Sequence, residues 1–112
     1  MKLRRQYQTI IDAKGVARID ITPNNAAMEW KIFQVPIFTE TFVVGCVGAV
    51  FHNDSYLHST PNGSLDAAAG PPYPIVGPGD VFTVSWTGGH PGDQATVTIW
   101  YEENPAGTSQ PT

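Results

Sequence analysis

Polar and apolar residues alternate in short stretches along this chain. In the stretch GVARIDIT, for example, Ala17, Ile19 and Ile21 would point to one side and the intervening residues to the other. A repeat of two residues is typical of a β-strand with one buried face. No segment shows the 3.6-residue repeat of an amphipathic helix. The sequence therefore predicts an all-β protein.

Six to eight short strands are expected, separated by turns that use many of the 11 glycines and 10 prolines of this 112-residue chain. The longest irregular stretch is 53–79, with short strands expected near Ser55–His58 and Tyr73–Val76. A chain of this length forms a single domain, residues 1–112, with a modest core. Two antiparallel sheets packed face to face, a jelly-roll-like β-sandwich, would bury such strands economically.

Two neighbouring stretches are apolar enough to belong to this core. In EWKIFQVPIFTE, strict alternation places apolar residues on opposite faces: Trp30 and Ile32 on one, and Phe33, Val35 and Ile37 on the other. Pro36 lacks an N–H group, which suits an edge or a β-bulge. The next stretch, Phe42–His52, contains the only cysteine, Cys46. We expect Cys46 to be a small buried residue and not a nucleophile.

The stretches Val81–Trp86 and Ala95–Tyr101 flank a loop, TGGHPGDQ. Because each stretch has one apolar face, we expect them to pair as an antiparallel hairpin with Val84 opposite Val97. A phosphate-binding loop would need a lysine and a following helix, and this segment has neither. The loop is therefore interpreted as a turn, with Asp93 capping it.

The opposite face of this hairpin would carry hydroxyl groups and one aromatic ring. Thr83 would lie opposite Thr98, and Trp100 would lie at the far end of the face. Such a face suits contact with another protein as well as with solvent. Thr83, Thr98 and Trp100 are therefore candidate interaction residues.

Charge is divided unevenly along the chain. All six basic residues lie in the first 31 positions, with three acidic ones, and residues 32–112 carry seven acidic residues and no lysine or arginine. This division, unless it is chance, predicts head-to-tail packing of copies or electrostatic docking. Docking would use a basic N-terminal arm, residues 1–5, with Lys2, Arg4 and Arg5 as contacts. A nucleic-acid-binding protein would interleave basic and aromatic residues, so nucleic acid is not an expected partner.

The polar residues 104–112 are expected to form a flexible tail.

No catalytic, metal or cofactor site is predicted. His52, Asp54 and His58 lie close in sequence, but no further ligand follows at a recognisable metal-binding spacing. Ser55, His58 and Asp66 match a hydrolytic triad in residue type only, because the chain has no G-x-S-x-G motif. No apolar run approaches the roughly 20 residues of a membrane span, and no apolar segment follows the basic start as in a signal peptide.

Several short segments occur in a characteristic order: Thr22-Pro23, then Trp30-Lys31-Ile32 with Val35, then Cys46, then NGSLD at 62–66, then Gly79-Asp80, and finally WTGGHPG at 86–92 followed by Ala95-Thr96-Val97. In this order they resemble small virion proteins of tailed phages, especially those of actinobacterial hosts. The resemblance covers residues 15–101, and the WTGGxPG segment is its most specific part.

The resemblance implies a non-enzymatic accessory component of the virion. A capsid decoration protein on the capsid exterior is favoured by the short basic N-terminus and the absence of fibre-like repeats. The implied partner is the major capsid protein, the implied state a homo-oligomer such as a trimer, and the implied site of synthesis the host cytoplasm. The alternatives are a minor tail or baseplate protein bound to tail proteins, and a carbohydrate-binding module that uses Trp100 and the tyrosines of 53–79 on a host-surface glycan.

Overall fold

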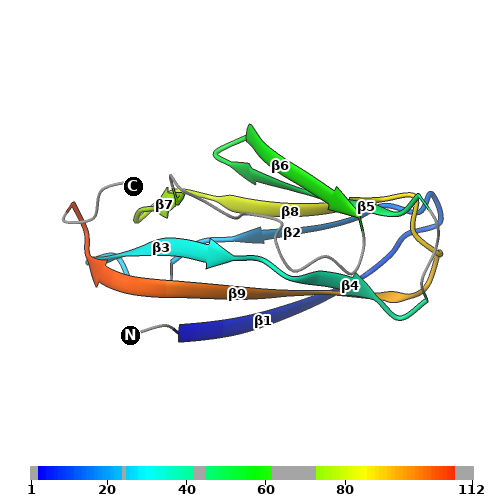
Figure 1. The fold of residues 1–112 in the computed structure, drawn as a ribbon, viewed down its shortest axis with the longest axis horizontal. Coiled ribbons are helices and arrows are strands. Elements are labelled where there is room, and N and C mark those ends of the chain that lie inside the picture. The colour runs from blue at the N-terminus through cyan, green and yellow to red at the C-terminus, as the bar shows by residue number, and fades with distance from the viewer. Residues whose placement is uncertain (1–2, 24, 42–44, 62–72, 108–112) are drawn as a thin grey trace.

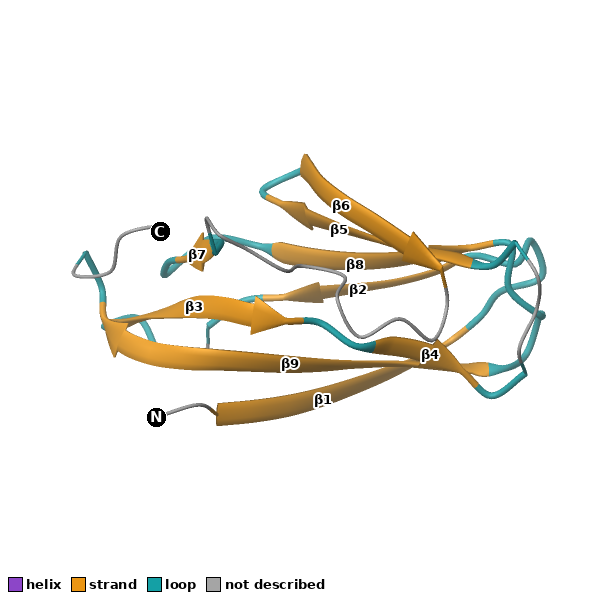
Figure 2. Ribbon diagram, viewed as in Figure 1, coloured by secondary structure: helices purple, strands orange, loops and turns teal. Residues whose placement is uncertain are grey.

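The computed structural model describes residues 3–23, 25–41, 45–61 and 73–107, which form strands and loops (Figure 2). The strands are β1 (Leu3–Ile10), β2 (Ala17–Ile21), β3 (Met28–Gln34), β4 (Ile37–Thr39), β5 (Val47–His52), β6 (Ser55–Pro61), β7 (Ile75–Val76), β8 (Phe82–Thr87) and β9 (Gln94–Pro105). Among the described residues there is no helix of the length and apolarity needed to cross a membrane.

The strands form two antiparallel sheets packed face to face (Figure 1). Sheet A has the order β1-β9-β3-β7, with β4 also paired to β9, and sheet B has the order β2-β8-β5-β6. Except at the β3–β4 and β5–β6 connections, each successive strand lies in the other sheet. This order of two interlocked Greek keys defines a jelly roll. The predicted jelly-roll-like β-sandwich is confirmed.

The core fills the space between the inner faces of the two sheets. Its largest members are buried aromatic and branched side chains: Trp30, Ile32, Ile37, Val76, Val97, Ile99 and Tyr101 from sheet A, Ile21, Val50, Phe82, Val84 and Trp86 from sheet B, and Ile11 and Val35 from connections. The rings of Trp30 and Tyr101 have centroids 4.4 Å apart. Cys46 adjoins this core just before β5, buried as predicted, and burial raises the pKa of its thiol.

A β-bulge in β3 changes which residues of the EWKIFQVPIFTE stretch face the core. Ile32 lies opposite Tyr101, but the next paired residue, Gln34, lies opposite Trp100, so Phe33 is an extra residue. An extra residue in one strand reverses the direction of all side chains that follow. Trp30 and Ile32 therefore share the core with Val35 and Ile37, and the prediction that they lie on opposite faces is wrong.

The predicted hairpin between residues 81–86 and 95–101 does not form. Val84 pairs with Ile19 and Val50 in sheet B, whereas Val97 pairs with Tyr7 and Ile37 in sheet A. The two strands lie in different sheets, and their apolar faces meet across the core. Alternation identified the buried face of each strand correctly. The same alternation occurs, however, in two strands that are hydrogen-bonded in one sheet and in two strands that pack against each other from different sheets.

The loop between β8 and β9 crosses from one sheet to the other at one end of the sandwich. It is held by backbone hydrogen bonds to the β1–β2 loop: Gly89 N donates to Gly15 O at 3.0 Å, Gly92 N to Ile11 O at 2.8 Å and Ile11 N to Asp93 O at 2.9 Å. The turn interpretation stands for residues 91 and 92, which form a turn. The segment as a whole is an inter-sheet connection.

The carboxylate of Asp93 caps a neighbouring loop. Its Oδ2 accepts a hydrogen bond from Thr41 N at 2.8 Å, and its Oδ1 lies 3.4 Å from His90 Nδ1. The hydrogen bond from Thr41 lowers the pKa of Asp93, with the His90 contact acting in the same direction. Asp93 thus links the β8–β9 connection to the β4–β5 connection beside it. The sequence predicted only that Asp93 would cap its own turn.

The two ends of the chain also differ from the prediction. The basic arm expected over residues 1–5 is strand from Leu3 onward, because β1 pairs with β9 from Leu3 to Ile10. At the other end β9 continues through Pro105, so residues 104 and 105 are not part of a tail. Residues 1, 2 and 108–112, with Lys2 among them, lie outside the described part of the structure.

Candidate interaction surfaces

The outer face of sheet A brings together three of the predicted interaction residues. Arg4 lies opposite Trp100 in the β1–β9 ladder, and its Cζ atom is 5.7 Å from the centroid of the indole ring. Thr98, two residues before Trp100, points to the same face and lies opposite Gln6. A guanidinium over an indole ring is a cation–π contact, which holds both side chains in place on the surface.

Arg5 points the other way and is part of the sandwich. Its Nε donates to Tyr101 Oη at 2.9 Å, and its guanidinium lies 5.5 Å from the centroid of the Trp30 ring. The hydrogen bond to Tyr101 is the main reason that the pKa of Arg5 is raised. Because successive residues of a strand point to opposite faces, Arg4 and Arg5 cannot form one basic patch. Arg5 contributes to the packing of the sandwich, and of the two arginines only Arg4 lies on the outer face.

Thr83 lies on the outer face of sheet B, on the opposite side of the molecule from Thr98. Its side chain is covered by neighbours, and its Oγ1 donates to Asp20 Oδ1 at 2.7 Å. Arg18 Nε donates to the same carboxylate oxygen at 3.0 Å. The Thr83 hydrogen bond, followed by that of Arg18, lowers the pKa of Asp20. The predicted pairing of Thr83 with Thr98 is therefore wrong.

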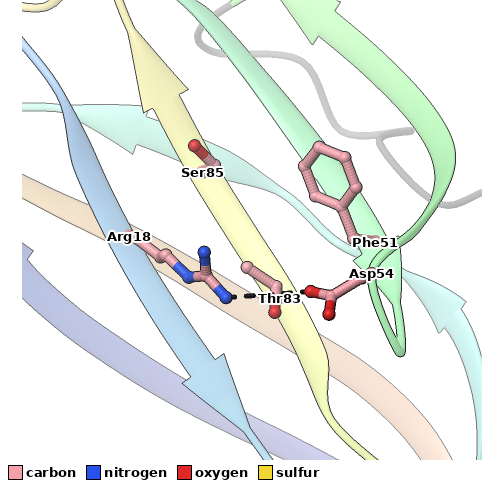
Figure 3. A pocket seen from close by; sticks show the side chains of 5 residues that line it. All are labelled: Arg18, Phe51, Asp54, Thr83 and Ser85. Atoms are coloured by element: carbon pink, nitrogen blue, oxygen red, sulfur yellow. Dashed lines mark ion pairs between the residues drawn. The ribbon is translucent and has the colours of Figure 1, made fainter.

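A depression of about 200 Å³ opens on this outer face of sheet B, and we call it the sheet B depression (Figure 3). Its lining comes from three neighbouring strands and the β5–β6 turn: Arg18, Phe51, Asp54, Thr83 and Ser85. The ladder places Arg18 opposite Ser85 and Phe51 opposite Thr83. Arg18, Phe51 and Ser85 were not predicted as site residues, although alternation placed Ser85 on the hydroxyl-bearing face of the hairpin with Thr83. Their outward positions could be read from alternation, but their proximity requires knowledge of the strand order.

The turn between β5 and β6 places Asp54 over this depression. Asn53 and Asp54 both have positive φ angles, 50° and 67°, as the two central residues of a type I′ hairpin turn require. Asn and Asp tolerate this left-handed conformation better than other residues with side chains. The dipeptide Asn53-Asp54 before a strand was the sequence signal for this hairpin, and the sequence analysis did not use it.

Asp80 is the centre of a second polar cluster, at the end of the sandwich where β5 and β8 meet. Its carboxylate accepts hydrogen bonds from Asn53 Nδ2 at 3.0 Å and Gly77 N at 2.9 Å, and lies 2.9 Å from His52 Nε2. The Asn53 hydrogen bond is the largest of the effects that lower the pKa of Asp80, against an opposing effect of burial. His52 is thus a partner of Asp80, and this cluster ties the loops together.

Acid is expected to weaken the fold in part through Asp80. A carboxyl group whose pKa is lower in the folded protein stabilises it above the unfolded pKa, and this stabilisation is lost as the pH falls through the folded pKa. The free energy of unfolding should therefore decrease as the pH is lowered below about 4. Asp80→Asn should lower it by about 1–3 kcal/mol at neutral pH, because the amide repels at least one donor. Urea unfolding at neutral and acid pH measures both effects.

The matched control is Asp54→Asn, which removes an exposed carboxylate that accepts no hydrogen bond from the described residues. It should change the free energy of unfolding by less than about 0.5 kcal/mol. In Asp80→Asn the loss of stability on acidification should also be smaller than in the wild-type protein. An acid transition identical in the two would show that Asp80 does not contribute to it.

The residues considered for metal binding or catalysis lie only partly within the described structure. Within the described residues, no three histidine, cysteine, aspartate or glutamate side chains come close enough to hold a metal ion. The side chain of His58 and the whole of Asp66 lie outside the described part of the structure. No family model matches this sequence, and no curated protein or solved structure shows significant similarity to it.

Proposed function

We propose that this chain is a non-enzymatic structural protein of a phage virion, a capsid decoration protein that binds the major capsid protein on the capsid exterior. The resemblance over residues 15–101 supports this proposal, and its most specific segment, WTGGHPG, has a packing role that suits a structural protein. Backbone hydrogen bonds from Gly89 and Gly92 fasten that segment to the β1–β2 loop.

The observation that carries the proposal is the composition of the sheet A outer face. Besides Arg4 and Trp100, this face exposes two large apolar side chains, Ile10 at 59% and Phe38 at 47%. Ile10 lies opposite Gln94 and Phe38 opposite Thr96, so both lie at the same end of β9. Tryptophan, arginine and phenylalanine are enriched at the centres of protein interfaces. A face with anchors at the start and in the middle of its central strand suits a flat protein partner.

The basic charge on this face would be carried by Arg4 and not by Arg5. A guanidinium above a partly exposed indole can pair with a carboxylate of the partner while the ring is buried beneath it. Docking should therefore weaken as salt increases, because exposed charges are screened beyond about 8 Å at physiological ionic strength. The same stacking covers one side of the Trp100 ring, which weighs against Trp100 as a sugar-binding platform.

The proposal is tested on purified particles that contain the chain. Particles are stripped, the full-length protein is added back, and occupancy is measured by quantitative mass spectrometry at low and high salt. Trp100→Ala and Phe38→Ala should each reduce affinity tenfold or more, as expected for interface anchors. Ser85→Ala, on the opposite face, is the control and should rebind like the wild type. Equal rebinding by all four proteins would refute docking through sheet A.

Copy number in the intact particle distinguishes the structural alternatives. A decoration protein should be present in proportion to the major capsid protein, and as the same oligomer, for example a trimer, that the isolated protein forms. A count of only a few copies per particle would instead assign the chain to the tail or baseplate. Absence of the chain from purified particles would overturn the proposal altogether.

A further inference from the structure

The sheet B depression combines an aromatic wall with a polar floor. Phe51 forms the wall and packs edge-to-face against Tyr56, with ring centroids 5.8 Å apart and Tyr56 60% exposed. Thr83 and Ser85 lie on the adjacent strand β8 and form the floor. In Figure 3 the side chains of Arg18 and Asp54 reach toward each other from opposite sides, across Thr83. The depression therefore offers an apolar surface beside polar groups.

Of the polar groups around the depression, Arg18 is held in place by hydrogen bonds, whereas Asp54 and Ser85 retain unused hydrogen-bonding capacity. Arg18 is fixed through its Nε by Asp20, which is itself fixed by Thr83. Arg18 Nη2 lies 4.0 Å from Asp54 Oδ1, too far for a direct hydrogen bond. Within the described residues, neither the Asp54 carboxylate nor the Ser85 hydroxyl makes a hydrogen bond. A hydroxyl group between Arg18 and Asp54 could accept from one and donate to the other.

The charges of this cluster limit the chemistry of a ligand. The two negative charges of Asp20 and Asp54 exceed the single positive charge of Arg18, so the cluster would repel an anionic ligand. A purely apolar ligand would cover Arg18 and Asp54 without giving them partners, which costs free energy. A metal ion would be repelled by the positively charged guanidinium of Arg18, which lies between the two carboxylates. A neutral ligand with several hydroxyl groups avoids all three penalties.

We propose that the sheet B depression binds a neutral saccharide. The hydroxyl groups of one sugar ring would satisfy Arg18, Asp54 and Ser85, and its polarised C–H groups would lie against the negative face of the Phe51 ring. The volume of the sheet B depression, about 200 Å³, is below the roughly 300–1,000 Å³ of pockets for drug-sized ligands. The site therefore holds about one ring, with any further sugar units extending over Tyr56. This binding activity is separate from docking through sheet A.

The test is a titration of the full-length, ¹⁵N-labelled protein, followed by amide chemical shifts. The probes are glucose, galactose, mannose and N-acetylglucosamine, each as the free monosaccharide and as a short oligomer, with glucuronic acid as an anionic probe. At least one neutral sugar should give saturable shifts confined to the depression, around residues 18–20, 51–54 and 83–85, with glucuronic acid weaker. Tighter binding of the oligomer than of the monosaccharide would identify a polysaccharide chain as the source of the ligand.

Two variants test the assignment within the depression, and one tests the opposite face. Asp54→Asn keeps a residue that tolerates the positive φ angle and should weaken binding about tenfold, because a charged acceptor is lost. Ser85→Ala removes a floor hydroxyl and should weaken it less. Trp100→Ala should bind like the wild type, so failure of the virion proposal leaves this test unaffected. No saturable shift with any neutral sugar, unchanged binding by Asp54→Asn, or shifts centred on Trp100 would each overturn the proposal.

Discussion

Replacing Val97 with aspartate is expected to lower the free energy of unfolding by several kcal/mol. Val97 is 0% exposed, and in the ladder of sheet A it lies between Tyr7 of β1 and Ile37 of β4. A carboxylate at this position would be buried in an apolar core without a partner, at a cost of several kcal/mol. Since domains of this size are stable by only about 5–15 kcal/mol, that cost takes up a large part of the total. Circular dichroism and urea unfolding would measure it.

The control for this prediction is the neighbouring substitution Thr98→Asp. Thr98 is half-exposed and points away from the core, so its carboxylate would remain in contact with water. The expected loss is below about 1 kcal/mol. A similar loss in both variants would contradict the assignment of inner and outer faces to β9, on which the proposed docking surface of sheet A depends.

The second large effect is expected from Gly15→Ala. Gly15 has a φ angle of +79°, and a Cβ atom placed on it would lie 2.8 Å from Gly89 O in the β8–β9 connection. The left-handed conformation alone costs about 1–2 kcal/mol for a residue with a side chain. The contact is with backbone, so relieving it requires the two loops to separate and weakens the hydrogen bond from Gly89 N to Gly15 O. We expect a total loss of about 3 kcal/mol or more in urea unfolding.

Gly79→Ala separates the two contributions to that loss. Gly79 has a similar φ angle of +84°, but a Cβ atom added there would have no neighbour within 4 Å. This variant should therefore show only the conformational cost, about 1–2 kcal/mol. If Gly15→Ala is no more damaging than Gly79→Ala, the close approach of the two loops does not contribute to stability.

The inner and outer faces of most strands could be predicted from the sequence, because alternation reflects burial directly. The buried side chains of β8 and β9 were identified in this way, including Val84, Trp86 and Val97. The pairing of these strands was predicted wrongly, because the loop between them can close a hairpin or cross between sheets. Alternation also failed at Phe33, where an inserted residue reverses the pattern without any distinctive residue type.

The candidate surfaces were predicted less well, for a related reason. Arg4, Thr98 and Trp100 come together because they lie on adjacent strands, β1 and β9, far apart in sequence. Arg5 was grouped with Arg4 by its charge, although its position in the strand directs it toward Tyr101. The sheet B depression depends on the neighbouring positions of β2, β8 and β5. Such proximity follows from strand order, and strand order is not encoded by any local pattern.

The central place of β9 in sheet A has a consequence for how the chain folds during synthesis. β9 pairs with β1, β3 and β4, so these strands cannot form their ladders with it until β9 has been made, and only the short β3–β7 ladder of this sheet is independent of β9. Only the β5–β6 hairpin joins strands that are close in sequence within one sheet. Pairings between distant residues must overcome the entropy of closing long loops and form slowly. The apolar side of β1 therefore stays uncovered until β9 is available, and the sandwich closes only when β9 joins sheet A.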